Sequence, residues 1–216
     1  MTRPDAILLV GPTGCGKTPL GERLQRRGLW GRPCRHFDFG ERMRRLVAGG
    51  EPRADLTPGE IGVLRAVLRC GALLEDEHWT IAEKILRAFL AEGAAGGDEL
   101  IVLNGLPRHT GQAEAIEAVL TVRAAIELAC TPAAVSERIR RDVGGDRAGR
   151  TDDDEAAMRD KLAVFAARTL ALLDHYRRRG AAVETVRVGV DTTAEDVRRM
   201  LEGQGRSMAA FGDAPC

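Results

Sequence analysis

The sequence contains very few lysines and carries no net charge. Of its 32 basic residues only three are lysine, and 32 acidic residues bring the formal net charge to +0. A neutral chain has no overall electrostatic attraction to nucleic acid or to an anionic membrane, so we expect neither as a partner. The other basic residues are arginines, whose planar guanidinium binds a phosphate through two parallel hydrogen bonds.

Paired cysteines and long apolar runs are also absent. The five cysteines are scattered and form no C-x-x-C pair, which argues against a disulfide framework or a zinc site and favours incidental thiols in a reducing compartment. No run reaches the roughly 18 apolar residues of a membrane helix, and the N-terminal apolar stretch is too short for a signal peptide. We therefore expect a cytoplasmic protein.

The length and composition are those of one domain. With 216 residues, 44% of them hydrophobic, the chain has enough apolar side chains for a sizeable core. We place this domain at residues 1–203. Residues 204–216 are rich in Gly and Ala and are expected to form a flexible tail.

Apolar runs alternate with amphipathic segments along the chain. The expected strands are 6–10, 34–39, 99–108, 124–130 and 182–188, and the expected helices are 17–28, 41–49, 56–71, 76–90, 111–120, a segment opening at Thr131, 152–180 and 192–202. This alternation predicts an α/β fold with three layers, in which helices cover a parallel five-stranded sheet. Ligands of such sheets bind beyond the carboxyl ends of the strands.

Several helix starts carry capping residues. Thr57 and Thr131 are expected N-caps because each precedes a proline, which suits the first helical position. Asp152 and Glu155 form a candidate capping box for the helix 152–180. The apolar face of that helix comprises Met158, Leu162, Phe165, Leu172 and Tyr176, with Thr169 in the gap.

Residues Gly11–Thr18 match the pattern G-x-x-x-x-G-K-T, between an expected strand and an expected helix. This context indicates a phosphate-binding loop rather than a glycine-rich turn that binds nothing. Lys17 would reach the outer phosphates, and the Thr18 hydroxyl would bind Mg²⁺. Pro19 falls in the first helical turn, where its missing amide proton is tolerated. The expected ATP-binding residues of this loop are Gly11, Gly14, Cys15, Gly16, Lys17 and Thr18.

A second constellation, NGLPR at 104–108, stands at the end of an expected strand. Alone it is compatible with a simple turn. Its meaning comes from the segments that follow the phosphate-binding loop in order: HFDFGERMR (36–44), NGLPRHTGQAE (104–114), SERIRR (136–141) and the cluster of Arg150, Asp152 and Asp153.

These segments resemble the adenylate kinase family of nucleoside monophosphate kinases, over about residues 5–202. Gly11–Leu24 is similar to the family's glycine-rich loop, 36–44 to its S-T-G-D-x-x-R segment, and 104–116 to its D-G-F-P-R-x-x-x-Q-A segment. The resemblance implies a P-loop kinase fold with a helical acceptor-binding insert at about 40–78. The short segment at about 142–151 implies the short-lid type, without a zinc lid.

The resemblance also implies roles for individual residues. Arg44 and Arg108 would bind the acceptor phosphate. Gly105 would place its backbone near the acceptor base, and Gln112 would contact the base edge. On the donor side Arg138 would pack on adenine, while Arg150 and Lys161 would bridge phosphates from the lid. The expected catalytic residues are Lys17, Arg44, Arg108, Arg150 and Lys161.

Four positions depart from the family pattern. Asn104 stands where the family carries an aspartate that orders water on Mg²⁺, and the lost charge is expected to weaken the metal site. Lys161 replaces an arginine, so a point charge stands where a planar fork is expected. Asp142 falls near the place of another lid arginine. The fourth departure is Asp38–Phe39 in place of Ser-Thr.

The departure at Asp38 and Phe39 bears on the acceptor base. Ionised Asp38 only accepts hydrogen bonds, so it suits an amino group of cytosine, adenine or guanine. Alternatively, Asp38 caps the helix that starts near Gly40, since Asp is a favoured N-cap. Phe39 either stacks on a base or fills space.

The expected function is transfer of the γ-phosphoryl group of ATP to a nucleoside monophosphate, with AMP as the favoured acceptor. The expected cofactor is Mg²⁺, bound by Thr18 and, through water, by Asn104. The expected partners are these nucleotides, and the expected state is a monomer. Two alternatives stay open: a P-loop kinase for another small metabolite, and a nucleotide-binding regulator that has lost catalysis, which Asn104, Lys161 and Asp142 favour.

Overall fold

The protein forms a three-layer α/β structure, as the sequence predicts. The structure is a computed structural model that describes residues 3–50, 55–93, 98–145 and 155–203. All strand pairs of its five-stranded sheet are parallel, in the order β2-β3-β1-β4-β5. The strands are β1 (Asp5–Val10), β2 (Cys34–Asp38), β3 (Leu100–Asn104), β4 (Thr121–Ala129) and β5 (Ala182–Arg187). The sheet confirms the five predicted strands, although β3 ends at Asn104, before the predicted end at Arg108.

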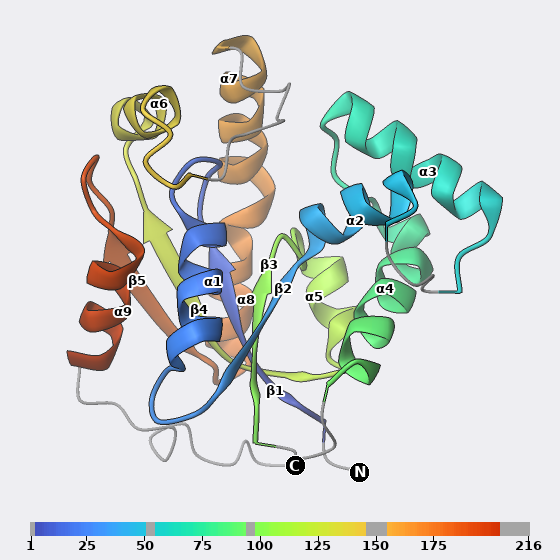
Figure 1. The fold of residues 1–216 in the computed structure, drawn as a ribbon, viewed down its shortest axis with the longest axis horizontal. Helices are drawn as coiled ribbons and strands as arrows, with labels where there is room; N and C mark the ends of the chain where they lie inside the picture. The colour runs from blue at the N-terminus through green and yellow to red at the C-terminus, as the bar shows by residue number, and fades with distance from the viewer. Residues whose placement is uncertain (1–2, 51–54, 94–97, 146–154, 204–216) are drawn as a thin grey trace.

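Helices cover both faces of the sheet (Figure 1). One face carries α1 (Lys17–Arg27) and α9 (Ala194–Gly203), which pack against each other. The other face carries α4 (Trp79–Ala91), α5 (Thr110–Ile116) and α8 (Ala171–Arg178). Alternate residues of β1 point to opposite faces, so that Leu8 belongs to one buried apolar cluster and Leu9 to the other. The two clusters hold the three layers together.

The helices α2 (Phe39–Ala48) and α3 (Pro58–Cys70) pack on each other and lie to the right of the sheet in Figure 1. The start of α3 has the predicted N-cap Thr57, and Glu60 completes a capping box that was not predicted: the Thr57 hydroxyl accepts from the Glu60 amide and the Glu60 carboxylate accepts from the Thr57 amide. A short 3-10 turn, η1 (Asp76–His78), leads into α4.

The helix predicted at 152–180 is confirmed within the described residues, but it is not a regular α-helix. It consists of α7 (Glu155–Val164), the π-helical segment η2 (Phe165–Thr169) and α8. The predicted face holds in α8, where Leu172 and Tyr176 are buried. Asp152 of the predicted capping box and the side chain of Met158 lie outside the described residues.

The helix α6 (Pro132–Arg140) begins as predicted, with the Thr131 hydroxyl accepting from the Ala134 amide. Within the described ranges, no helix is both long enough and apolar enough to cross a membrane. The predicted tail at 204–216 falls outside those ranges, as does most of the predicted lid.

Candidate functional site

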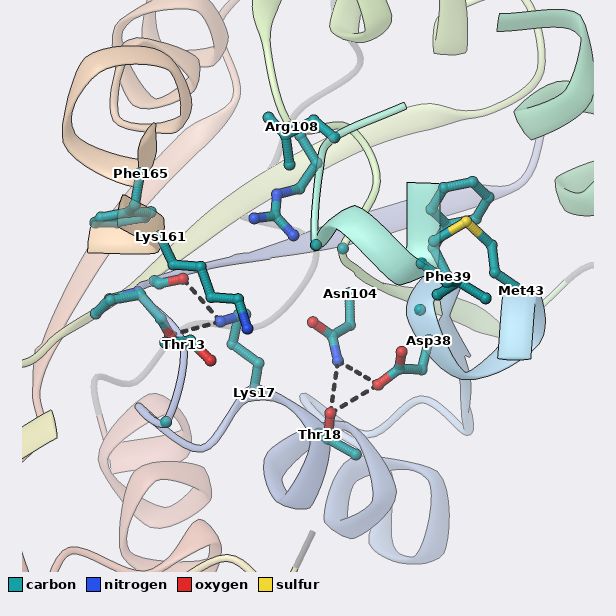
Figure 2. A pocket seen from close by; sticks show the side chains of 18 of the residues that line it. Thr13, Lys17, Thr18, Asp38, Phe39, Met43, Asn104, Arg108, Lys161 and Phe165 are labelled. Carbon is teal, nitrogen blue, oxygen red and sulfur yellow. Dashed lines mark hydrogen bonds between the residues drawn. The ribbon is translucent and has the colours of Figure 1, made fainter. Parts of the chain in front are cut away.

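A pocket lies where the carboxyl ends of β1, β2 and β3 meet (Figure 2). Its walls come from the loop after β1, the start of α2, the end of α3, the loop after β3, and the helix formed by α7 and η2. The pocket therefore gathers both motifs found in the sequence, as expected for ligands of a parallel sheet.

The phosphate-binding loop is shaped by glycines in left-handed conformation. Gly14 has φ 76° and Gly16 has φ 98°, values that a residue with a Cβ adopts only under strain. Gly16 is also the N-cap of α1, so the first amides of this helix face the pocket without helical partners. Pro19 lies in this first turn, and the helix continues past it with the Leu20 amide donating to the Gly16 oxygen at 3.0 Å. The loop thus has the form of an anion site.

The Lys17 ammonium is folded onto its own loop. It donates to the main-chain oxygens of Gly11 and Pro12, both at 2.7 Å. Burial lowers the pKa of Lys17 below its ordinary value. The Cys15 side chain is only 1% exposed, so of this residue the backbone alone is placed to serve the pocket.

Three polar side chains meet beneath the loop, one each from α1, β2 and β3. The Thr18 hydroxyl donates to Asp38 Oδ2 at 2.7 Å, and Asn104 Nδ2 donates to the same oxygen at 2.7 Å and to Thr18 Oγ1 at 3.0 Å. Asp38 Oδ1 accepts from the Glu41 amide at 3.0 Å and so caps α2. The capping alternative for Asp38 is therefore confirmed, with α2 starting one residue before the expected Gly40. Both carboxylate oxygens are engaged with protein groups.

Two arginines line the opposite side of the pocket. Arg44 projects from α2, is 41% exposed, and pairs with Glu41 at 2.9 Å. Arg108 follows β3 and points into the pocket above Asn104 (Figure 2). Burial lowers the pKa of its guanidinium, and the nearby Asp38 carboxylate opposes that effect. Within the described residues, no hydrogen bond of this guanidinium is seen, so its donors are open to a ligand.

Comparison with known proteins places the chain in a family. A family model described as an AAA domain matches residues 7–159. Adenylate kinase from Synechococcus sp. (strain CC9311) is 32% identical over 180 residues, which cover 81% of this chain and 85% of the relative. Adenylate kinase from Clavibacter michiganensis subsp. michiganensis (strain NCPPB 382) is 30% identical over 211 residues, covering 95% of each chain. The chain belongs to the adenylate kinase family.

One residue assigned through the resemblance to this family, Gln112, is held by main-chain groups. Its side chain is 1% exposed, Oε1 accepts from the Arg108 amide at 2.9 Å, and Nε2 donates to the Leu74 oxygen at 2.6 Å. Gln112 is absent from the pocket wall. Each end of its amide is hydrogen-bonded to a main-chain group in this placement, and contact with the acceptor base stays a prediction.

The part of the pocket expected to hold the acceptor base is apolar. Phe39 and Met43, one turn apart on α2, line it together with Val67 and Leu68 of α3. Phe39 is only 4% exposed and its ring centroid lies 6.1 Å from that of Phe37, so it mainly fills space beside the pocket. Gly105 lies in the wall with φ 83°. Met43, Val67 and Leu68 were not among the residues expected from the sequence, although the spacing of Met43 from Phe39 could have indicated it.

Arg138, expected on the donor adenine, is 5% exposed and joins two loops. It donates to the Gly14 oxygen at 3.1 Å and to the oxygens of Gly189, Val190 and Thr192 at 2.8–2.9 Å. The guanidinium thus braces the phosphate-binding loop against the segment between β5 and α9. Stacking of Arg138 on the donor adenine stays a prediction.

Of the expected lid residues, the structure places Lys161 in the pocket wall, on α7. Asp142 lies just after α6 and its backbone is in the left-handed region, with φ 44°. Its main-chain oxygen accepts from the Gly145 amide at 2.9 Å. Arg150 falls outside the described residues.

Proposed function

We propose that the protein is a nucleoside monophosphate kinase that transfers the γ-phosphoryl group of ATP to AMP in preference to other monophosphates. One observation carries this proposal: a phosphate-binding loop and two arginines, Arg44 and Arg108, line the same pocket. The loop suits a nucleoside triphosphate, and paired guanidiniums suit a second phosphate group facing it. The relatives named adenylate kinase support AMP as that second nucleotide.

On the donor side, the amides at the start of α1 and the Lys17 ammonium would hold the phosphates. Lys17 now occupies the oxygens of Gly11 and Pro12, which lie in the same loop, so it reaches a bound phosphate by a side-chain rotation. Arg138 would support adenine with its flat face while its edge holds the loops.

On the acceptor side, Arg44 and Arg108 would grip the monophosphate and align it with the donor. The apolar wall of Phe39, Met43 and Val67 suits the flat face of a base. Because the acceptor phosphate is already an anion, no general base is needed. Catalysis then rests on position and charge, as in other phosphoryl transfers.

The residues below the loop fit a magnesium ion. Thr18, Asp38 and Asn104 present a hydroxyl, a carboxylate and an amide oxygen to one corner of the pocket. Mg²⁺ prefers oxygen ligands and keeps several waters beside substrate phosphates, so one carboxylate is sufficient. When bound, the ion would neutralise charge on the β- and γ-phosphates. Cations of this chain, Lys17 and Lys161 with Arg150 from a short lid, would offset the remaining charge.

Two other functions are compatible with a phosphate-binding loop. A kinase for another small metabolite, such as a sugar or a carboxylate, is disfavoured because two guanidiniums, Arg44 and Arg108, suit an anionic acceptor phosphate. A nucleotide-binding regulator would keep the loop and lose turnover, and the substitutions Asn104, Lys161 and Asp142 favour it most.

The test is an acceptor screen. Purified protein is mixed with Mg·ATP and AMP, CMP, UMP, GMP or dAMP, and nucleoside diphosphate formation is followed, with ATP binding measured by calorimetry in parallel. Turnover with AMP above that with the other acceptors supports the proposal. Binding of ATP without any turnover would establish the regulator instead, and a preferred acceptor other than AMP would overturn the AMP assignment.

A further inference from the structure

We propose that Asp38 supplies the negative charge of the magnesium site, in place of the aspartate that the family pattern has at position 104. This inference rests on the proposed function, because it concerns how Mg²⁺ is held with ATP. It assigns a metal-site role to a residue at the end of β2, whereas the resemblance predicts that role for the end of β3.

Asp38 and Asn104 are direct neighbours in the sheet. They are register partners at the ends of the adjacent parallel strands β2 and β3. Adjacent strands lie about 4.8 Å apart, so a carboxylate moved from one position to the other stays in the same corner of the pocket. The family pattern has an acid at 104 and a small hydroxyl residue at 38, whereas this chain has an amide at 104 and an acid at 38. The two substitutions together keep one negative charge.

The hydrogen bonds orient both side chains for this task. An ionised carboxylate only accepts hydrogen bonds, so the Asn104 amide must turn its nitrogen toward Asp38, as it does at 2.7 Å. The Asn104 oxygen then points away from Asp38 toward the pocket (Figure 2). The Thr18 hydroxyl, which would bind the ion, donates to Asp38 at 2.7 Å. The Asp38 carboxylate is therefore in contact with the expected metal ligand itself.

The charges around the pocket indicate that Asp38 is the residue that can supply negative charge to a bound Mg²⁺. Among the described residues that line the pocket, Asp38 is the one carboxylate, and it stands against four cations: Lys17, Arg44, Arg108 and Lys161. A divalent cation entering a pocket with that balance needs a fixed negative charge beside the phosphates. Asp38 also caps α2, so its position is held by the backbone of that helix.

Three variants separate the charge of Asp38 from its cap. Asp38→Asn removes the charge, and Asn caps a helix as well as Asp, so the fold is expected to persist. Asp38→Asn with Asn104→Asp returns the charge to the family position. Asp196→Asn is the matched control, since Asp196 accepts from Thr193 at the start of α9 and is not part of the pocket.

The measurement is the gain in ATP affinity that Mg²⁺ gives, as the ratio of dissociation constants in EDTA and in excess Mg²⁺, by calorimetry. Mn²⁺ bound with ATP, followed by electron paramagnetic resonance, provides a second reading of metal affinity. Metal-supporting side chains typically contribute 10–100-fold to affinity, so Asp38→Asn should reduce the gain by about this factor. The double variant should recover most of it, and Asp196→Asn should leave it unchanged.

The outcomes distinguish the two proposals. If wild-type protein shows no Mg²⁺-dependent gain in ATP binding but turns over AMP with Mg·ATP, this inference is overturned and the proposed function stands; if it shows no turnover either, the proposed function is overturned as well. If wild type shows the gain and Asp38→Asn retains it in full, only the role of Asp38 is wrong. A loss in Asp38→Asn that the double variant does not recover would show that Asp38 acts through its geometry, and would overturn the exchange of charge with position 104.

Discussion

The Thr169 hydroxyl donates a hydrogen bond of 3.1 Å to the main-chain oxygen of Arg108. Thr169 is 5% exposed and closes the π-helical segment η2, whereas Arg108 lies in the loop after β3. The Arg108 amide donates a second hydrogen bond, to the side-chain oxygen of Gln112. The backbone of Arg108 is thus held on both sides, which fixes the origin of the guanidinium that points into the pocket.

Thr169→Val should weaken acceptor binding. The change keeps the shape of the side chain and removes one hydrogen bond, whose net contribution is about 0.5–1.5 kcal/mol. We expect the KM for the monophosphate to rise several-fold while kcat stays within about twofold, which steady-state kinetics would measure. The control is Thr185→Val, whose hydroxyl bonds to Glu127 at the exposed surface of the sheet. Equal KM values for the two variants would contradict a positioning role for Thr169.

Lys17→Met should abolish most of the turnover and leave the fold intact. Removing one preorganised charge or donor from a transition state typically lowers kcat by about 10²–10³. Folding should not suffer, because burial already lowers the pKa of the Lys17 ammonium. Lys84→Met, at a half-exposed lysine paired with Glu60 at 2.7 Å, is the matched control. Activity of Lys17→Met within tenfold of wild type would place the donor phosphates elsewhere.

Gln112→Ala separates a structural role from base recognition. Its loss leaves one buried and one partly buried main-chain group unpaired, each worth about 1–3 kcal/mol, so the free energy of unfolding should fall by roughly 2–6 kcal/mol in urea denaturation. Gln25→Ala, at an exposed glutamine that accepts from the His36 amide, should change it far less. A variant of wild-type stability with a raised KM for one base only would support the base-contact role instead.

Asp5→Asn should lower stability in a pH-dependent way. The Asp5 carboxylate is partly desolvated, but hydrogen bonds from Arg123 and Arg32, at 2.7 Å and 2.8 Å, hold its pKa below the ordinary value. Since the folded pKa is depressed, the carboxylate stabilises the fold above its unfolded pKa, and this is lost as pH falls through the folded pKa. We expect a deficit of about 1 kcal/mol at pH 7, because the pairs stay partly solvated.

The measurement for Asp5→Asn is thermal unfolding between pH 7 and pH 2. The difference from wild type should shrink once the pH drops below the ordinary aspartate value of 3.8. Asp174→Asn, on the exposed surface of α8, provides the comparison. A deficit that stays constant across this range would assign the effect to packing rather than to charge.

Local sequence signals account for the fold. The strands were predicted from continuous apolar runs, and the helix starts at Thr57 and Thr131 from a threonine followed by proline, because these features act within a few residues. The π-helical segment was not predictable in this way. Its last residue, Thr169, bonds to Arg108, 61 positions away, so its geometry depends on tertiary contacts.

In the candidate site, too, some features follow from the local sequence and others depend on tertiary contacts. The helix cap made by Asp38 is a local feature and was one of the two alternatives left open. The hydrogen bond that Asn104 donates to Asp38 spans 66 positions in the sequence. It depends on the register of β2 and β3, which no short motif predicts. Gln112, in α5, was assigned from the motif around it, yet its side-chain amide donates to the main-chain oxygen of Leu74, 38 positions away in the loop between α3 and η1. Motifs therefore indicated which residues gather at the site, whereas strand register and tertiary contacts determine the hydrogen bonds that each one makes.

The π-helical segment η2 also sets how far α7 is rotated relative to α8 about the helix axis. Successive residues of an α-helix are turned by 100°, and a π turn contains about one residue more than an α turn. Lys161 lies before η2 and faces the pocket, whereas Leu172 and Tyr176 lie after it and face the sheet. Winding all residues of η2 as regular α-helix would therefore rotate α7 by about 100° relative to α8, whereas deleting one residue between Phe165 and Thr169 would restore a regular helix with that rotation nearly unchanged. The π turn, and not only the identity of the residues, thus decides which side of α7 carries Lys161 toward the pocket.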